Sequence, residues 1–563
     1  MTTHEWAAPG PGSWIRDPDH QTSAWTRYLY AMIFPAFDRG YREGFARYGV
    51  LIDHLDARIV NGWMFARPRP VGAPDKPGNP PPKLVIKAMF LLHPELRRRA
   101  KTAREIFRTR PWRQEAERWY GEERDGLRRR NLDLQAVDLE ALDDTELQRH
   151  LAAATQVFTE GTTIHFRHNP ATSVPLGDWL GRTIEWTGAS AEEALLALRG
   201  KSPASVGMIE PLDRLAEAIK SDSRALAALQ ANGQASIRIE QLRAGSPEVR
   251  SQWDAYVTEY GHRTVTGFDV DDLTLLELPS LLVSTVAARV ALQRAAVPAA
   301  EAAAARLRER VPSVHRAEYD DLLSQAALMY GLRDDDVGIG EQWPLGLVRR
   351  ALLEAGRRLQ RKGAVTDVED VFESTPDEVR ALLAAEGIAP TSAELHRRAA
   401  ERRAQSAIEP PLSIGEAEGP PPRADVLPPA VARVINAMML SLNLMVQLEQ
   451  PSLKSVNGQV TGLGVSTGRY AGRARLVRGA QDFEKIVSGD VLIARTTTPT
   501  YNVVLPLLGA IVTDRGAALS HAAIVAREFG IPAVVGTNDA TTRIPDGAWV
   551  AVDGDRGVVT IEG

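Results

Sequence analysis

Apolar residues follow two different periods along the chain, and the change of period divides it. Before residue 409, apolar residues recur every three or four positions in several segments, such as residues 30–48 and 347–359, which is the period of an amphipathic helix. From residue 455 onward, short β-rich runs alternate with glycines. The pattern predicts a multidomain chain with a large, mainly α-helical part and a C-terminal β/β/α domain of about a hundred residues.

An aromatic stripe at helical spacing marks the first 70 residues. We expect this segment to be largely helical and to end in a turn at residues 60–63. The stripe is expected to be core, although its members together also suit a site for a flat apolar substrate. Its members are Tyr30, Phe34, Phe37, Tyr41, Phe45 and Tyr48. A second long helix is expected from residue 139, ended by Pro170.

Proline and glycine place the domain boundaries. Residues 409–423 are rich in Pro, Gly and Glu, which is typical of a linker, and a helical apolar pattern follows them. We therefore expect a helical substrate-binding domain over residues 1–408. A linker with a connecting helix should cover residues 409–454, and the β/β/α domain residues 455–563.

Composition and charge narrow the function classes. The net charge of −5 gives no electrostatic case for nucleic acid or an anionic membrane, so neither is expected as a partner. The chain has no cysteine, which excludes disulfides and thiol catalysis. Its first residues lack the basic and apolar regions of a signal peptide, and no apolar run reaches membrane-spanning length. A cytoplasmic protein is expected.

The candidate chemistry centres on His521. A strand ending at Thr513 is followed by a loop with Gly516, and Ser520 is a favoured N-cap for a helix that stops at Gly530. His521 is thus expected at the first turn of a helix, where the dipole disfavours an imidazolium. Free backbone N–H groups at that end can receive a phosphoryl group carried on the ring.

The same segment resembles the phosphohistidine (swivelling) domain of phosphoenolpyruvate-utilising enzymes, among them phosphoenolpyruvate synthase, pyruvate phosphate dikinase and rifampin phosphotransferase. The matching residues are Thr513, Gly516, Ser520, His521, Ala522, Ala523, Ala526, Arg527, Gly530, Ile531, Pro532 and Ala533. Many family members have a second glycine before the Ser-His pair, where this chain has Ala517, Ala518 and Leu519. The resemblance implies that His521 is the phosphoryl carrier.

A second segment of the C-terminal domain supplies candidate phosphate-binding residues. The family has a Thr-rich turn with proline where this chain has residues 495–499, which implies a phosphate-binding role. The expected phosphate-binding residues are Arg495, Thr497, Thr498, Thr513, Gly516 and Ser520.

A Tyr-Gly-His-Arg turn at residues 260–263 resembles one in the substrate domain of rifampin-phosphotransferase-type enzymes. His262 would move a proton and Arg263 would bind substrate. Alternatively, His262 caps a helix end and Arg263 pairs with Asp269 or Asp271. His165 and His168 are expected in the substrate pocket rather than at a metal, because no third ligand is evident nearby.

Two parts of the family are not found in the sequence: an ATP-grasp nucleotide-binding domain and a pyruvate-binding barrel. The chain looks like the phosphohistidine subunit of phenylphosphate or alkylphenyl phosphate synthase, whose partner carries the ATP-grasp fold. That resemblance implies an ATP-dependent phosphotransferase in which ATP and Mg²⁺ bind to the partner subunit and the acceptor is a small hydroxylated aromatic. The alternatives are a split rifampin-like antibiotic phosphotransferase and a non-catalytic phosphocarrier or regulatory protein.

Overall fold

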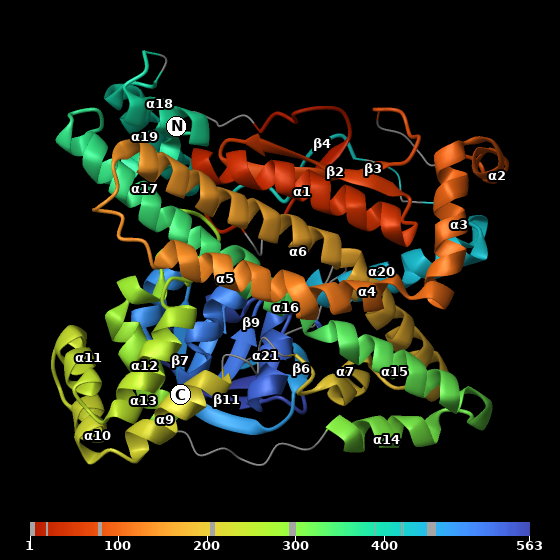
Figure 1. Ribbon diagram of the computed structural model, residues 1–563. Coiled ribbons are helices and arrows are strands. Elements are labelled where there is room, and N and C mark those ends of the chain that lie inside the picture. The colour runs from red at the N-terminus through yellow and green to blue at the C-terminus, as the bar shows by residue number, and fades with distance from the viewer. Residues whose placement is uncertain are drawn as a thin grey trace. The chain divides into compact units, whose positions relative to one another are not determined.

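Two compact units make up the chain (Figure 1). The computed structural model describes residues 6–17, 21–76, 81–202, 209–291, 300–387, 389–417, 419, 422–446 and 458–562. Unit 1 comprises Met1–Ala171, Phe268–Asp272 and Ile339–Asn436. Unit 2 comprises Thr172–Gly267, Leu273–Gly338 and Ala437–Gly563. These units divide the chain differently from the predicted domains, whose boundaries stay a prediction.

Unit 1 contains a small sheet that the sequence analysis missed. Strands β2 (Ile52–Val60) and β3 (Trp63–Pro70) form a hairpin, and β1 (Ser13–Arg16) and β4 (Ser413–Gly415) extend it in the order β2-β3-β1-β4. The expectation that residues 1–70 are largely helical is therefore wrong beyond α1 (Arg27–Tyr48). The expected turn is confirmed, because Asn61 (φ 50°) and Gly62 (φ 77°) connect the two strands. Positive φ at both residues is the geometry of a type I′ hairpin.

Helices form the rest of unit 1. The apolar faces of α1, α6 and α17 share one core, in which Leu29, Leu151 and Leu352 are fully or almost fully buried. The helices of this unit are α1, α2 (Lys83–Leu92), α3 (Pro94–Thr109), α4 (Pro111–Arg118), α5 (Arg124–Gln135), α6 (Asp144–Thr187), α17 (Trp343–Arg361), α18 (Pro376–Ala384) and α19 (Ser392–Ser406). A π-helix, η1 (Trp119–Glu123), lies between α4 and α5.

Pro170 does not end α6. The helix continues through Pro170 and Pro175 to Thr187, passing from unit 1 into unit 2 at residue 172. Where it passes α1, a Cβ on Gly44 would lie 2.9 Å from the Arg167 carbonyl oxygen and 2.9 Å from Pro170. The helix thus continues past Pro170 where it packs closely against α1, although proline removes one backbone hydrogen bond.

Unit 2 begins with helices. They are α7 (Ala191–Leu195), α9 (Ile209–Lys220), α10 (Ser223–Gln230), α11 (Ala235–Arg243), α12 (Pro247–Tyr260), α13 (Pro279–Ala291), α14 (Ala300–Arg310), α15 (Arg316–Tyr330) and α16 (Leu332–Val337). The expected connecting helix is α20 (Pro429–Val446), which starts in unit 1. Residues 418, 420, 421 and 447–457, which include part of the predicted linker, lie outside the described residues.

An eight-stranded sheet at the C-terminal end completes unit 2, with the order β5-β12-β11-β7-β8-β9-β10-β6. The strands are β5 (Gln459–Thr461), β6 (Leu463–Ser466), β7 (Arg469–Val477), β8 (Asp490–Ala494), β9 (Leu508–Thr513), β10 (Ala533–Val535), β11 (Trp549–Asp553) and β12 (Val558–Glu562). Strands β7, β8, β9 and β10 run parallel, and the helix α21 (His521–Phe529) contacts β6, β9 and β10. The prediction of a mainly helical chain with a strand-rich C-terminal domain is confirmed.

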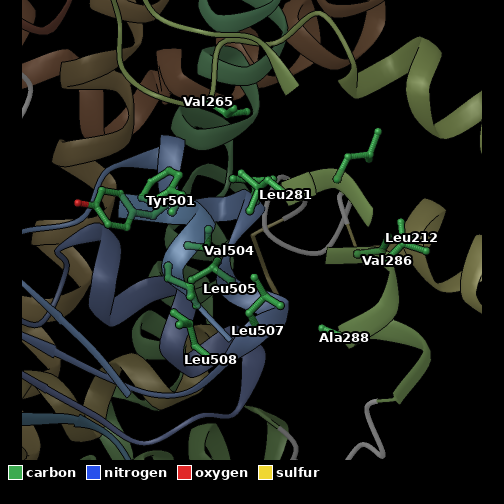
Figure 2. Close-up of a cluster of buried hydrophobic side chains, with 14 of the residues drawn as sticks. Leu212, Val265, Leu281, Val286, Ala288, Tyr501, Val504, Leu505, Leu507 and Leu508 are labelled. Carbon is green, nitrogen blue, oxygen red and sulfur yellow. The ribbon is translucent and has the colours of Figure 1, made fainter. Parts of the chain in front are cut away.

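The helices and the C-terminal domain of unit 2 share a buried apolar cluster (Figure 2). Leu281 and Val286 of α13 pack with Tyr501, Val504 and Leu505, which belong to two short 3₁₀ turns, η9 (Pro499–Val503) and η10 (Leu505–Leu507). No helix within the described part of the chain is long and apolar enough to cross a bilayer.

Candidate active site

His521 is the first residue of α21, as the sequence predicts. Ser520 is the N-cap, with an extended backbone (φ −64°, ψ 157°), and its hydroxyl accepts a hydrogen bond from the Ala523 N–H at 3.4 Å. Gly530 ends the helix in the left-handed region (φ 70°). Local sequence alone therefore places the imidazole at the positive end of the helix dipole.

The parallel strands β8 and β9 bring two loops to the same edge of the sheet. After β8 the chain continues at Arg495, and after β9 it continues at Asp514. The Asp514 N–H donates to the Ala494 carbonyl at 3.0 Å, and the Arg515 N–H to the Arg495 carbonyl at 2.8 Å. The carboxyl ends of parallel strands are where α/β sheets place their ligand sites.

Glycine is required in the loop between β9 and α21. Gly516 has φ 117°, a conformation that L side chains rarely adopt, and a Cβ there would lie 2.8 Å from the Ser520 hydroxyl oxygen. Before it, the buried Thr513 hydroxyl donates to the Arg515 carbonyl at 2.6 Å. Thr513 and Gly516 therefore shape the loop, and their predicted contacts with phosphate stay a prediction.

Two buried charged side chains anchor this loop. The Asp514 carboxylate accepts hydrogen bonds from the Thr537 hydroxyl at 3.2 Å and from the Thr541 N–H at 3.0 Å. Arg527, 1% exposed, donates to the Ala518 carbonyl at 2.6 Å and the Val465 carbonyl at 3.3 Å. Since each group is satisfied by hydrogen bonds, the start of α21 is held rigidly.

The residues that replace the usual family glycine are buried. Ala517, Ala518 and Leu519 are at most 5% exposed. Ala518 and Leu519 belong to an apolar cluster that Leu444 of α20 packs against. The Leu519 N–H donates to the Leu444 carbonyl at 2.6 Å, so the connecting helix contacts the loop directly before His521. The residues that differ from the family pattern are thus buried, and two of them pack in the cluster with Leu444 of α20.

The His521 ring is half-buried, and both of its nitrogens have a described partner. The Thr497 hydroxyl lies 2.9 Å from Nδ1, and the Asn502 amide oxygen lies 2.9 Å from Nε2. An amide oxygen only accepts, so Nε2 carries the proton in this arrangement and Thr497 donates to the lone pair of Nδ1. Both partners are uncharged, and this arrangement suits a neutral imidazole.

The predicted phosphate-binding residues are only partly gathered around His521. Thr497 contacts the ring directly, whereas the Thr498 hydroxyl is bonded to Thr500 at 2.7 Å. Arg495 is exposed, and its carbonyl accepts from the opposite loop. A phosphate-binding role for Arg495, Thr498 and Ser520 stays a prediction.

His262 and Arg263 lie in the turn after α12, also in unit 2. Arg263 Nε donates to the Glu259 carbonyl at 2.9 Å, and its guanidinium lies 4.4 Å above the Tyr260 ring. The aspartates considered as its alternative partners are engaged elsewhere: the Asp269 carboxylate accepts from the Thr26 N–H at 2.7 Å, and Asp271 pairs with Arg402 at 2.6 Å. The proposed proton transfer by His262 stays a prediction.

His165 and His168 lie on α6 in unit 1, whereas His521 belongs to unit 2. His165 contacts the edge of Phe166, with ring centres 5.2 Å apart. His168 is completely buried, and its Nε2 lies 3.8 Å from the Glu115 carboxylate. Their predicted place in a substrate pocket stays a prediction.

Asn502 was not predicted as a site residue. It lies 19 residues before His521, in the irregular turn η9, and no periodic pattern marks it. The only available signal was its place just after the Thr-rich turn, in a stretch of otherwise apolar residues.

Two family models match the chain. Residues 486–557 match the PEP-utilising enzyme mobile domain, which includes Arg495, Asn502 and His521. Residues 165–334 match the rifampicin phosphotransferase fourth domain, which includes His262 and Arg263.

Several curated proteins are similar to parts of this chain. A chondramide synthase of Chondromyces crocatus is 30% identical over 58% of the chain and 8% of its own length. A rifampicin phosphotransferase of Streptomyces sviceus is 28% identical over 56% of the chain and 35% of its own length. A probable phosphoenolpyruvate synthase of Pyrococcus abyssi is 48% identical over 17% of the chain and 12% of its own length.

This chain therefore spans well under half the length of these relatives. The matched segments confirm the resemblance to phosphoenolpyruvate synthase and rifampin phosphotransferase that the sequence predicts. Residues 486–557 are thus similar to the mobile domain of phosphoenolpyruvate-utilising enzymes, and residues 165–334, which precede them, are similar to a domain of rifampicin phosphotransferase.

Proposed function

We propose that this chain is a phosphotransferase subunit that carries phosphate on His521. The donor is ATP, bound with Mg²⁺ on a separate ATP-grasp subunit, and the acceptor is the hydroxyl of a small organic molecule, with a phenol as the first candidate. The observation that carries the proposal is the position of His521. It begins α21 inside the matched mobile domain, with uncharged partners on both ring nitrogens.

The reaction has two transfers. In the first, a ring nitrogen of His521 attacks the β-phosphorus of ATP, the N–P bond forms and the P–O bond to AMP breaks. By analogy with the family, water then cleaves the β–γ bond, so that phosphate leaves and the β-phosphoryl stays on the ring. In the second, the acceptor oxygen attacks the phosphohistidine, the N–P bond breaks and the ring becomes neutral again. A base such as His262 takes the hydroxyl proton. The two transfers need different surroundings, so the C-terminal domain would swing on the segment over residues 409–454.

Aromatic side chains in unit 1 support a flat acceptor. Phe37 and Tyr41 of α1 contact Phe166 of α6, with ring centres 4.7 and 5.1 Å apart. Tyr41 remains half-exposed, and His165 adjoins the same ring of Phe166. Aromatic side chains in stacked and edge-to-face contact next to a polar ring suit a phenol. Under this proposal, His165 would contact the acceptor.

The test is transfer of labelled phosphate. The purified chain is mixed with an ATP-grasp partner and ATP labelled in the β-phosphoryl group, and an acid-labile adduct on His521 is sought by mass spectrometry. The variant His521→Ala should lose all labelling, while His315→Ala, on a half-exposed turn of unit 2, should keep it. The carrier role is rejected if wild-type His521 remains unlabelled when the partner is active.

A second candidate is an antibiotic phosphotransferase, which the match of residues 165–334 to a rifampicin phosphotransferase domain favours. The labelled protein separates the candidates when it is offered phenol or rifampicin. An aryl phosphate supports the first proposal, a phosphorylated rifampicin the second, and an adduct that both leave unchanged supports a phosphocarrier.

A further inference from the structure

The segment that contacts the Nε2 side of His521 is also held by the helices of unit 2. Asn502 places its amide oxygen 2.9 Å from Nε2. The carbonyl of the next residue, Val503, accepts a hydrogen bond from the Thr285 hydroxyl of α13 at 2.8 Å. Thr285 is 1% exposed, so this bond is shielded from water. One short stretch of backbone thus connects α13 to the His521 ring.

Apolar packing holds the same segment on both sides of Asn502. Tyr501, Val503, Val504 and Leu505 are at most 9% exposed and belong to the cluster shared with α13 (Figure 2). Asn502 is half-buried and is the polar residue within this run. Its backbone is therefore held in place by buried neighbours, and this placement directs its amide oxygen to Nε2.

A small cavity adjoins Asn502 on the side of α13. Its volume is about 10 Å³, and Tyr256, Thr285 and Arg289 are among its lining residues. That volume holds about one water molecule. The Asn502 amide oxygen thus contacts Nε2 on one side, while the segment that contains Asn502 packs against α13 on the other.

We propose that Asn502 is a positioning residue that covers Nε2 of His521 while α13 holds its segment, and that release of this segment uncovers the nitrogen. The inference rests on the carrier role proposed for His521. It adds a coupling: the contact of the C-terminal domain with α13 determines whether Nε2 can react. Docking and reactivity are thereby linked through Thr285, Val503 and Asn502.

The reactivity of His521 depends on which of its two ring nitrogens carries the proton. In the covered state Nε2 holds the proton and donates it to Asn502. For Nε2 to attack phosphorus, the ring must hold its proton on Nδ1, where the Thr497 oxygen can accept it. Loss of the Asn502 contact removes the interaction that favours the unreactive tautomer at Nε2.

Potassium phosphoramidate tests the inference without a partner protein. Nε2 attacks its phosphorus, the N–P bond to the ring forms, the P–N bond to ammonia breaks, and the ring proton leaves as ammonium. Asn502→Ala and Thr285→Val should each raise the initial rate of His521 labelling about fivefold, the factor that corresponds to one net hydrogen bond. The readout is mass spectrometry of the full chain, with His521→Ala as the blank.

Two further variants distinguish the specific contact of Asn502 with Nε2 from a general destabilisation of the domain. Ser441→Ala removes an equivalent buried bond, from its hydroxyl to the Ser173 carbonyl at 2.8 Å, and should leave the rate unchanged. Asn502→Asp keeps an acceptor oxygen and should not exceed the wild-type rate. In ¹⁵N spectra, the Nε2–H tautomer of wild-type His521 should give way to a mixture in Asn502→Ala.

Equal labelling of wild type and Asn502→Ala would overturn the inference, as would an unchanged tautomer. If the rate of His521 labelling rises equally in Ser441→Ala, the increase arises from general destabilisation and not from loss of the Asn502 contact. These outcomes differ from failure of the proposed function, in which ATP and the partner leave His521 unlabelled although phosphoramidate still labels it.

Discussion

Two histidines of this chain lie in contrasting surroundings. His521 is half-buried at a helix start, with a hydroxyl and an amide on its two nitrogens. His168 is sealed in unit 1, perpendicular to the Trp119 ring at 5.8 Å and 3.8 Å from the Glu115 carboxylate. That carboxylate is itself 0% exposed and is surrounded by the guanidinium groups of Arg47, Arg118 and Arg167.

The difference concerns how each site tolerates a change of charge. Neutral partners can rotate a hydroxyl or turn an amide when a ring gains or loses a phosphoryl group. A buried ion cluster cannot lose one member without leaving the others uncompensated. The polar core of unit 1 should therefore control stability, whereas His521 can change its covalent state at little cost to the fold.

The largest expected effect comes from breaking the ion cluster. Glu115→Gln leaves the surrounding guanidinium groups without their buried counter-charge and should lower the free energy of unfolding by about 3 kcal/mol, the lower end for such pairs because Arg47 and Arg118 are partly exposed. His521→Gln should change it by less than about 0.5 kcal/mol. Urea unfolding followed by tryptophan fluorescence measures both. A similar decrease in the free energy of unfolding in Glu115→Gln and His521→Gln would contradict the proposed difference between the two sites.

The next effect tests the loop before His521. Gly516→Ala places a methyl group 2.8 Å from the Ser520 oxygen at φ 117° and should cost about 2 kcal/mol. Gly547→Ala is the matched control, because Gly547 also has a positive φ (81°) but no atom within 4 Å of the new Cβ. The difference between the two variants, measured by thermal unfolding, isolates the contact with Ser520. No difference would mean that the cap tolerates the methyl group.

A smaller effect concerns the chemistry of the ring. Thr497→Val removes the group that accepts the Nδ1 proton and should lower labelling of His521 about fivefold, opposite in direction to Asn502→Ala. Thr498→Val is the control, since the Thr498 hydroxyl bonds to Thr500. Phosphoramidate labelling measures the rates. If Thr497→Val and Thr498→Val label alike, Thr497 does not position the ring.

Several elements of the C-terminal domain could be predicted with both of their ends. Strands β6, β8, β10 and β11 begin and end where the apolar runs do. Ser520 and Gly530 likewise fix both ends of α21. These signals are local: alternation determines a strand, and a cap side chain or a positive φ ends a helix. The position of His521 could therefore be predicted from sequence.

Contacts distant in sequence could not be predicted. The hairpin of residues 52–70 was overlooked because the aromatic period was extended past its end, although Asn61 and Gly62 gave a strong turn signal. Pro170 was expected to end a helix because of its local effect on the backbone, but α6 continues past it and packs against Gly44. Asn502 reaches His521 through an irregular turn whose path depends on α13.

The smallest expected effect concerns the pH dependence of the stability of unit 1. Glu95, in the first turn of α3, accepts hydrogen bonds from Arg98 at 2.6 Å and from Arg99 at 2.7 Å. The bond from Arg98, opposed by partial desolvation and aided by the bond from Arg99, lowers the pKa of the Glu95 carboxyl to about 2. A lowered pKa means that the folded state binds fewer protons. The stabilisation is therefore present above the ordinary pKa of glutamate, about 4.3, and is lost as the pH falls towards 2.

Because the Glu95 side chain is 31% exposed, the loss should be below about 1 kcal/mol. The measurement compares the free energy of unfolding at pH 6 and pH 3 in wild type and in Glu95→Gln. Lys101→Gln, which removes a charge from the exposed face of the same helix, is the control. The decrease on acidification should be smaller in Glu95→Gln and unchanged in the control. If Glu95→Gln loses as much stability as wild type, the acid sensitivity of unit 1 arises from other ion pairs, and the Glu115 cluster is the next to test.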